Sequence, residues 1–248
     1  MGTSVLPREA PADSKSMAVK RQSRMVGMHQ SLAGAMRLAI TSLGTTLPHM
    51  TDWQQRYLDG DTPWDKGEAS PPLGELIERM GVELFGDGEV WVPGCGVGHD
   101  VRLLASHGLN VLGLDLAPAA IEAAISKPRV SSERFKIMDF LDPAQVAGRS
   151  AGAIWEHTCF CAIDPMHRDE YAHSAAEVLP PGRVLAGVFF LTPFDPGEEA
   201  VGPPFGSSIE EIDACFAPWF ERVEAWAPKA AYPGREGREW LAVYRRLT

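Results

Sequence analysis

Three glycines and one aspartate have the types and the spacing of a ligand-binding turn. Gly94, Gly96 and Gly98 directly follow the apolar, β-prone residues 89–92. Glycines at such a turn let the backbone approach a ligand that any Cβ would push away. Asp115 ends the next apolar run, where a carboxylate can accept hydrogen bonds from a ribose diol. A glycine-rich turn alone is more often an ordinary tight turn, so Asp115 is what favours a cofactor site here.

The glycine spacing distinguishes between two adenosine-containing cofactors. A dinucleotide-binding turn has the pattern G-x-G-x-x-G. Counted from Gly94 and Gly96, its third small residue would stand at position 99, but His99 and Asp100 follow instead. The spacing therefore disfavours NAD and favours S-adenosylmethionine.

Large aromatic side chains precede the glycine turn, in polar, loop-rich sequence. Structural packing would explain most residues such as Trp53, Tyr57 and Trp64. A second role is to wall a cofactor, because an aromatic face near a sulfonium cation gains about 0.5–2 kcal/mol of cation–π attraction. Asp139 and Phe140 end the third apolar run and are candidates to contact adenine. An acid at a strand end is, however, at least as often a helix cap or a turn former.

Alternating apolar runs and helical patterns must position these side chains. The runs predict successive strands over residues 89–92, 111–115, 135–140, 151–155 and 184–191. Helices are expected over residues 101–105, 118–125, 168–178 and 209–216, and closing strands around residues 223–227 and 240–244. This order predicts an α/β fold of the class I methyltransferase (Rossmann-like) type. Its sheet is doubly wound and mostly parallel, with an antiparallel C-terminal edge.

Composition limits the classes of function that the chain can have. The 248 residues are 45% hydrophobic and carry a net charge of −10, with a pI near 5.2. An acidic chain without a basic face argues against a nucleic-acid partner, and no apolar run is long enough to span a membrane. Four cysteines fit neither a disulfide framework nor a metal site, so reduced thiols and no metal are expected. These cysteines are Cys95, Cys159, Cys161 and Cys215.

The first 49 residues differ in composition from residues 50–248, which are expected to form the catalytic domain. No acidic residue occurs between Asp13 and Asp52, and apolar residues recur at helical spacing between Leu32 and Leu43. Four interpretations remain open: a disordered extension, an organellar targeting segment, a lid or interface helix, and a translation start that normally lies at Met50.

Several motifs in the same order carry a family resemblance. They include Thr62-Pro63-Trp64-Asp65-x-Gly67, Pro93-Gly94-Cys95-Gly96, Phe160-Cys161-Ala162-Ile163 and Gly202-Pro203-Pro204-Phe205. From about Trp53 to the C-terminus the chain resembles the thiopurine S-methyltransferase superfamily. Within it, the chain is most similar to the halide and thiol methyltransferase branch. The residues before Met50 are not covered by the resemblance.

The resemblance implies a set of binding residues. Those expected to contact S-adenosylmethionine are Trp53, Tyr57, Trp64, Gly94, Gly96, Asp115, Leu116, Asp139, Phe140 and Glu156. Those expected near the methyl acceptor are Trp64, His157, Phe160 and Phe205. The family branch often has tyrosine where this chain has His157. Because imidazole titrates near neutrality, His157 is the candidate catalytic residue, taking a thiol proton or stabilising the anion. The alternative is a histidine with satisfied hydrogen bonds in a loop or in the lining of the pocket.

The expected function is therefore the transfer of a methyl group from S-adenosylmethionine to a small sulfur nucleophile, such as hydrosulfide or methanethiol. Halide ions require no base and remain alternative acceptors, as do thiopurines and other small molecules. A cofactor-binding sensor without catalysis is the alternative from another class. The protein is expected to be a cytoplasmic monomer, with organellar import through the N-terminal extension as the exception.

Overall fold

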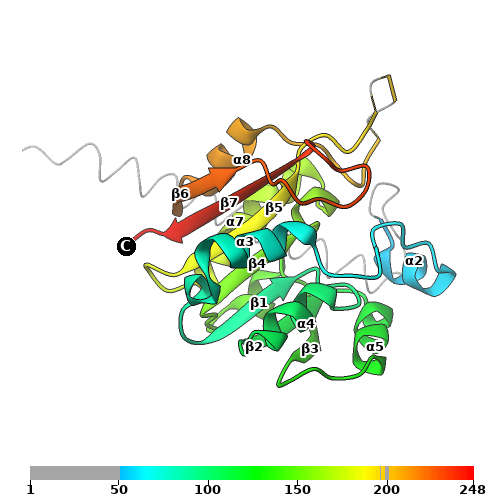
Figure 1. Ribbon diagram of the computed structural model, residues 1–248, viewed down its shortest axis with the longest axis horizontal. Helices are drawn as coiled ribbons and strands as arrows, with labels where there is room; N and C mark the ends of the chain where they lie inside the picture. Colours follow the sequence, from blue (N-terminus) through cyan, green and yellow to red (C-terminus); the bar gives the residue numbers. More distant parts are fainter. Residues whose placement is uncertain (1–50, 196, 199–200) are drawn as a thin grey trace, which may run out of the picture. The chain divides into compact units, whose positions relative to one another are not determined.

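The structure is a computed structural model, and it describes residues 51–195, 197–198 and 201–248. Its centre is a seven-stranded sheet with strand order β3-β2-β1-β4-β5-β7-β6 (Figure 1). The helix and the targeting segment considered for residues 1–49 lie outside the described residues.

Strands β1 to β5 pair in parallel, and β7 runs in the opposite direction between β5 and β6. β7 pairs antiparallel with both β5 and β6, so the predicted mostly parallel sheet with an antiparallel edge is confirmed. The order reverses between β1 and β4, which pair directly. The strands are β1 (Glu89–Pro93), β2 (Asn110–Asp115), β3 (Arg134–Ile137), β4 (Ala153–His157), β5 (Val184–Phe190), β6 (Phe220–Trp226) and β7 (Glu239–Arg246).

The helices follow the pattern expected for alternating units. Proline begins both α3 and α5, where its missing N–H costs nothing. Ser208 and Glu211 form a capping box at the start of α8. The helices are α2 (Trp53–Asp59), α3 (Pro71–Met80), α4 (His99–Ser106), α5 (Pro118–Ser126), α6 (Pro143–Val146), α7 (Arg168–Val178) and α8 (Ile209–Phe216). Short 3₁₀ helices cover Val82–Phe85, Phe160–Ala162 and Pro165–His167.

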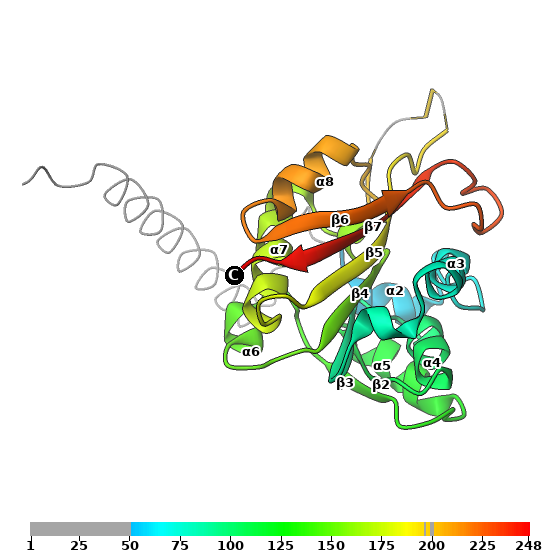
Figure 2. The ribbon, with the colours of Figure 1, turned by 60° about the vertical axis from the view of Figure 1, so that its left-hand side comes forward.

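Both faces of the sheet are buried, because alternate strand residues enter two separate hydrophobic clusters. Trp91 and Ile154 pack with α7 and α8 on one face. Val90 and Trp155 pack with α3 and α4 on the other. Figure 2 shows α7 and α8 on one side of the sheet and α3, α4 and α5 on the other. This alternation decides which helix each residue at the end of a strand can meet.

Of the predicted boundaries that differ from the observed ones, three concern residues near the site. β3 ends at Ile137 and not at Phe140, although the Met138 N–H still donates to the Asp115 carbonyl at 2.9 Å. α4 begins at His99, so Asp100 belongs to its first turn. β4 covers Ala153–His157, two residues later than expected, which makes His157 its last residue.

Two features are absent from residues 51–195, 197–198 and 201–248. No helix there is long and apolar enough to cross a membrane. No group of three or more histidine, cysteine or acidic side chains is arranged there to hold a metal ion.

Candidate active site

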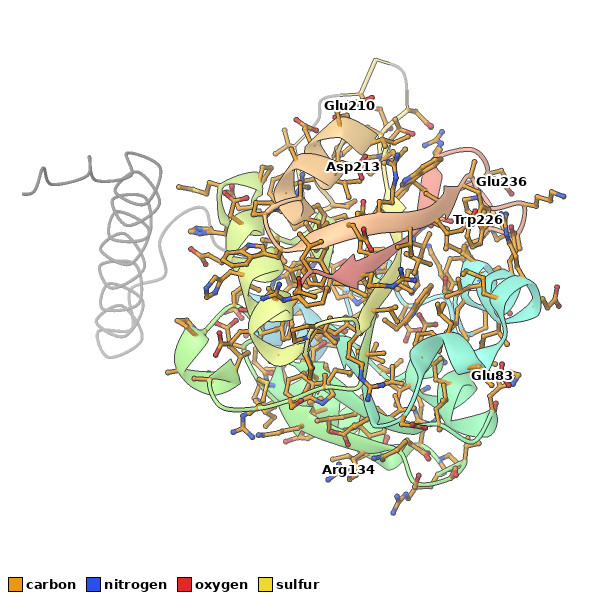
Figure 3. All side chains as sticks on the ribbon, turned by 90° about the vertical axis from the view of Figure 1, so that its left-hand side faces the viewer. Glu83, Arg134, Glu210, Asp213, Trp226 and Glu236 are labelled. Atoms are coloured by element: carbon orange, nitrogen blue, oxygen red, sulfur yellow. The ribbon has the colours of Figure 1, made fainter. Side chains whose placement is uncertain are left out.

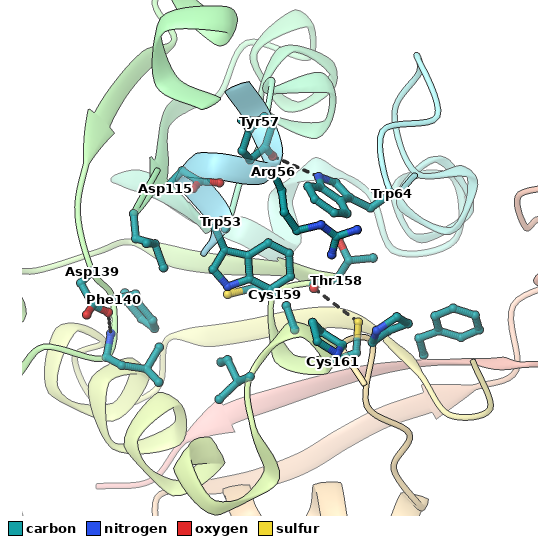
Figure 4. Close-up of a pocket in the computed structure, with 18 of the residues that line it drawn as sticks. Trp53, Arg56, Tyr57, Trp64, Asp115, Asp139, Phe140, Thr158, Cys159 and Cys161 are labelled. Atoms are coloured by element: carbon teal, nitrogen blue, oxygen red, sulfur yellow. Dashed lines mark hydrogen bonds between the residues drawn. The ribbon is translucent and has the colours of Figure 1, made fainter. Parts of the chain in front are cut away.

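The main pocket lies at the carboxyl ends of the parallel strands and has a volume of about 250 Å³. It spans the reversal of strand order, which is where open α/β sheets bind ligands. One end is formed after β2 and β3, and the other after β4 and β5. In Figure 4, Asp139 and Phe140 lie to one side of Trp53, and Trp64 lies to the other.

Asp115 connects the main pocket with the glycine turn. The residue is 8% exposed, and its carboxylate accepts the N–H of Gly96 and the N–H of Ala117, each at 2.9 Å. A carboxylate offers about four acceptor positions, so acceptor capacity remains for a ligand. Burial raises the pKa of Asp115 above its ordinary value, against the effect of the Ala117 and Gly96 hydrogen bonds. The residue therefore fixes the turn and still presents acceptor positions to a diol.

Gly94 is required by the protein itself as well as by any ligand. Its φ of 61° is left-handed, and an added Cβ would lie 2.7 Å from the Cβ of Cys159. The loop after β4 therefore packs directly on this glycine. The sequence explained Gly94 by the approach of a ligand, whereas the structure adds a contact between two loops.

An aromatic cluster covers the pocket from α2. Trp53 and Trp64 meet edge to face with ring centroids 5.2 Å apart, and the Trp64 Nε1 donates to the Tyr57 hydroxyl at 3.1 Å. The helix has no fully buried residue, so its large side chains are available to the pocket. Gln54 accepts the Ala119 N–H at 2.9 Å and attaches α2 to the start of α5.

A smaller second pocket of about 60 Å³ adjoins the main one and is lined by the glycine turn, Asp100, His157 and Tyr232. Tyr57, Trp64, Gly94 and Thr158 line both pockets. Thr158 has a left-handed φ of 63°, an uncommon conformation for a β-branched residue, and such residues gather at functional sites.

Comparisons with known proteins agree with this architecture. Residues 49–235 match the family described as Thiopurine S-methyltransferase (TPMT). The chain belongs to this family. It is 31% identical over 201 residues to the probable thiol methyltransferase 2 of Arabidopsis thaliana, covering 78% of this chain and 84% of that protein. It is 30% identical over 203 residues to thiocyanate methyltransferase 1 of Brassica oleracea, covering 79% and 84%.

A solved structure shares the fold of this thiopurine S-methyltransferase family member. It is a Burkholderia thailandensis 1,6-didemethyltoxoflavin-N1-methyltransferase with bound S-adenosylhomocysteine, at a TM-score of 0.58 and 18% identity. The alignment covers 79% of this chain and 86% of that one. The expected fold, the methyltransferase class and the cofactor S-adenosylmethionine are thus confirmed.

The described residues suit this cofactor. Of the ten residues expected to contact it, eight line the main pocket and Gly96 lines the second. The eight are Trp53, Tyr57, Trp64, Gly94, Asp115, Leu116, Asp139 and Phe140. Acceptor positions on Asp115, a close-packed glycine turn and an aromatic wall are the features that an adenosine and a sulfonium require.

Glu156, the tenth residue, lies outside the lining of both pockets. It is fully buried, and its two oxygens accept the Phe160 N–H at 2.7 Å and the Tyr171 hydroxyl at 2.5 Å. Phe160, expected near the acceptor, is also buried and stacks on Phe216 at 5.8 Å. The structure therefore places both side chains beneath the pocket, where they hold the loop after β4.

Two further residues lie away from their expected positions. His157 lines the second pocket and not the main one, and its Nδ1 lies 2.9 Å from Asp100 Oδ2. Its Nε2 is buried without a partner among the described residues. Phe205 is half-buried with its ring against Gly202, and Pro203 and Pro204 line the main pocket instead.

The sequence did not single out Arg56 and Arg235, which both line the main pocket. Arg56 lies over the Trp64 ring at 4.4 Å and pairs with Asp61 at 2.8 Å. Arg235 is 9% exposed and lies over the Phe190 ring at 4.5 Å. The only local signal for Arg235 is its place directly after a Pro-Gly turn. The pocket thus contains positive charge that the motifs do not show.

Replacing Glu156 by glutamine should change the pH dependence of stability. Burial raises the pKa of Glu156 to about 7, and the unfolded chain releases this proton at a lower pH. The native protein should therefore lose stability as the pH rises from about 4.5 to about 7. Glu156→Gln should remove this decrease, as measured by urea unfolding at several pH values. An unchanged slope would contradict the assignment, and the exposed Glu177→Gln on α7 is the control.

Proposed function

We propose that this protein transfers a methyl group from S-adenosylmethionine to a small sulfur nucleophile that binds as an anion. The observation that carries the proposal is an acceptor end of apolar side chains beside the Arg235 guanidinium. When bound, S-adenosylmethionine supplies the methyl group: the sulfur lone pair of the acceptor forms the new S–C bond, and the bonding pair of the broken bond stays on the donor sulfur. The relatives named for thiol and thiocyanate methylation support this class of acceptor.

Different residues along the pocket would bind different parts of the cofactor. Asp115 would hold the ribose, and Asp139 and Phe140 would contact the adenine. Trp53 and Trp64 would face the sulfonium, because they form the aromatic cluster over the centre of the pocket. The amino-acid end of the cofactor would then lie in the second pocket, next to the glycine turn.

The acceptor end is formed after β4 and β5. Ile163, Phe190, Pro203 and Pro204 supply apolar surface, and Arg235 supplies positive charge. An apolar environment excludes water and leaves an anionic nucleophile weakly solvated. Holding that nucleophile in line with the methyl group is then the main task of the protein.

Among the described residues that line the main pocket, none at this end can act as a general base. The pocket's two acids, Asp115 and Asp139, follow β2 and β3 at the opposite end. Burial raises the pKa of the Tyr57 hydroxyl and raises the pKa of Cys161 to about 12, so neither group ionises near neutrality. We therefore assign His157 to the second pocket beside the cofactor turn, and we infer that the acceptor arrives already ionised.

Methyl transfer to a panel of acceptors tests the function. Labelled S-adenosylmethionine should methylate hydrosulfide, methanethiol and thiocyanate. For thiocyanate, kcat/KM should stay constant between pH 6.5 and 9, since this anion needs no base. For the two thiols it should rise with the ionised fraction of the acceptor. Turnover of neutral amines or of thiopurines alone would contradict the proposal, and cofactor binding without any turnover would favour a sensor.

Halide methylation is the second candidate function. The same absence of a base at the acceptor end favours it, because iodide needs no proton removed. Iodide therefore belongs in the panel, and a clear preference for iodide over all sulfur acceptors would favour this function.

A further inference from the structure

Glu239 is a buried acid that neither the cofactor nor the acceptor requires. It begins β7 and is only 3% exposed. Its Oε1 lies 3.2 Å from Arg235 Nη1. Its Oε2 is buried and has no hydrogen-bond partner among the described residues. A buried carboxylate with one unsatisfied oxygen is costly, so its position beside Arg235 calls for an explanation.

The Arg235 guanidinium meets three groups. It lies over the rings of Phe190 at 4.5 Å and Tyr232 at 5.5 Å, and it pairs with Glu239. Because the pair is buried, solvent screens its charges weakly. Glu239 therefore opposes much of the positive potential that Arg235 would otherwise direct into the main pocket.

We propose that Glu239 determines specificity by limiting the charge of Arg235 that acts on the acceptor. This inference rests on the proposed function for the identity of the acceptor. A nearly neutral pair admits weakly hydrated, singly charged anions, which gain from the apolar surface. It offers too little charge to desolvate sulfate or phosphate, which are doubly charged or strongly hydrated. Glu239 thus acts through Arg235 and does not itself touch the acceptor.

The variant Glu239→Gln tests the proposal, because its amide oxygen can still accept from Arg235 while the negative charge is gone. Thiocyanate binding is measured by calorimetry on protein saturated with S-adenosylhomocysteine. We expect the Kd for thiocyanate to fall about tenfold, as the unscreened charge of Arg235 then acts on the anion. A loss of local structure would instead weaken binding and raise the Kd for thiocyanate.

Glu236→Gln is the matched control. It removes the same charge three residues earlier, in the loop before β7, but Glu236 is exposed at the surface (Figure 3). Its carboxylate accepts the Gly234 N–H at 2.8 Å, and a glutamine oxygen can do the same. We expect its Kd for thiocyanate to stay within about twofold of the native value, because solvent screens the charge. A tenfold change in the control as well would show a general charge effect and overturn the proposal.

A second pair of variants covers the case in which Glu239→Gln does not fold. Arg235→Gln should weaken thiocyanate binding more than about tenfold, because the negative charge of Glu239 is then unpaired and repels the anion. The double variant Arg235→Gln/Glu239→Gln removes both charges of the pair and should bind within about threefold of the native protein. A double variant as weak as Arg235→Gln alone would overturn the proposal.

The binding measurement separates this inference from the proposed function. Thiocyanate binding that responds to Glu239→Gln without any methyl transfer would overturn the proposed function and leave the role of Glu239 standing. Methyl transfer to thiocyanate with a Kd that is unchanged or raised in Glu239→Gln would support the proposed function and overturn the role of Glu239. Absence of thiocyanate binding in both the native protein and Glu239→Gln would overturn the role of Glu239.

Discussion

Replacing Asp115 by alanine is expected to lower the affinity for S-adenosylhomocysteine by about 100-fold or more and to abolish measurable methyl transfer. Two hydrogen bonds from a ribose diol to a carboxylate, at about 1.5 kcal/mol each, correspond to this loss. The variant also leaves the N–H groups of Gly96 and Ala117 without their acceptor. The glycine turn should therefore loosen together with the loss of the diol contacts.

Calorimetric titration with S-adenosylhomocysteine measures the effect directly. Asp115→Asn should fall between the native protein and the alanine variant, since an amide keeps one acceptor oxygen and loses the charge. Glu122→Ala is the matched control, because it removes an exposed acid from α5, the helix that follows Asp115. A folded Asp115→Ala protein that binds within threefold of the native affinity would contradict the assignment of the ribose site.

The cofactor end of the pocket was predictable because neighbouring parallel strands bring it together. β1 pairs with β2 in a register that sets Pro93 opposite Leu114. The glycine turn and Asp115 therefore follow the carboxyl ends of neighbouring strands at the same edge of the sheet. This placement does not depend on how distant parts of the chain fold. Apolar runs and helical spacing were sufficient to predict these strands and helices, and the order of the elements predicted the fold.

The acceptor end was not predictable from local patterns. Phe190, Pro203 and Arg235 come from three separate segments. They meet only because β7 enters the sheet antiparallel between β5 and β6. Arg235 belongs to the loop between the last two strands, and no spacing rule links that loop with β4. Arg235 reaches the pocket only because the sheet places β6 and β7 beside β5.

Side-chain alternation along β4 explains why Glu156 and His157 lie outside the main pocket. Successive strand residues point to opposite faces of the sheet. Glu156 points toward α7 and meets Tyr171, whereas His157 points toward α4 and meets Asp100. The sequence motif shows that both residues end a strand, but it does not show which face each enters. The residues after the strand, Thr158 and Cys159, are the ones that reach the pocket.

Replacing Asp100 by alanine is expected to cause the largest loss of stability of the substitutions considered. Its buried carboxylate accepts hydrogen bonds from the Ser70 N–H at 2.7 Å and from the Trp155 Nε1–H at 2.7 Å. It also lies 2.9 Å from His157 Nδ1. Alanine would leave these buried groups without an acceptor, which should lower the free energy of unfolding by about 3–5 kcal/mol. Urea unfolding at pH 7 measures this loss.

The pH dependence of stability separates the charge of Asp100 from its hydrogen bonds. Burial alone would raise the pKa of Asp100, but His157 and the hydrogen bonds from Ser70 and Trp155 hold it below its ordinary value. An acid with a lowered native pKa adds stability that is complete above its unfolded pKa of about 3.9, and that is lost as the pH falls further. Asp100→Asn should therefore flatten the stability profile below about pH 4. The control is Asp87→Asn, which replaces an exposed acid and should leave the profile unchanged. A profile of Asp100→Asn identical in shape to the native one would show that the carboxylate carries no charge-dependent stabilisation.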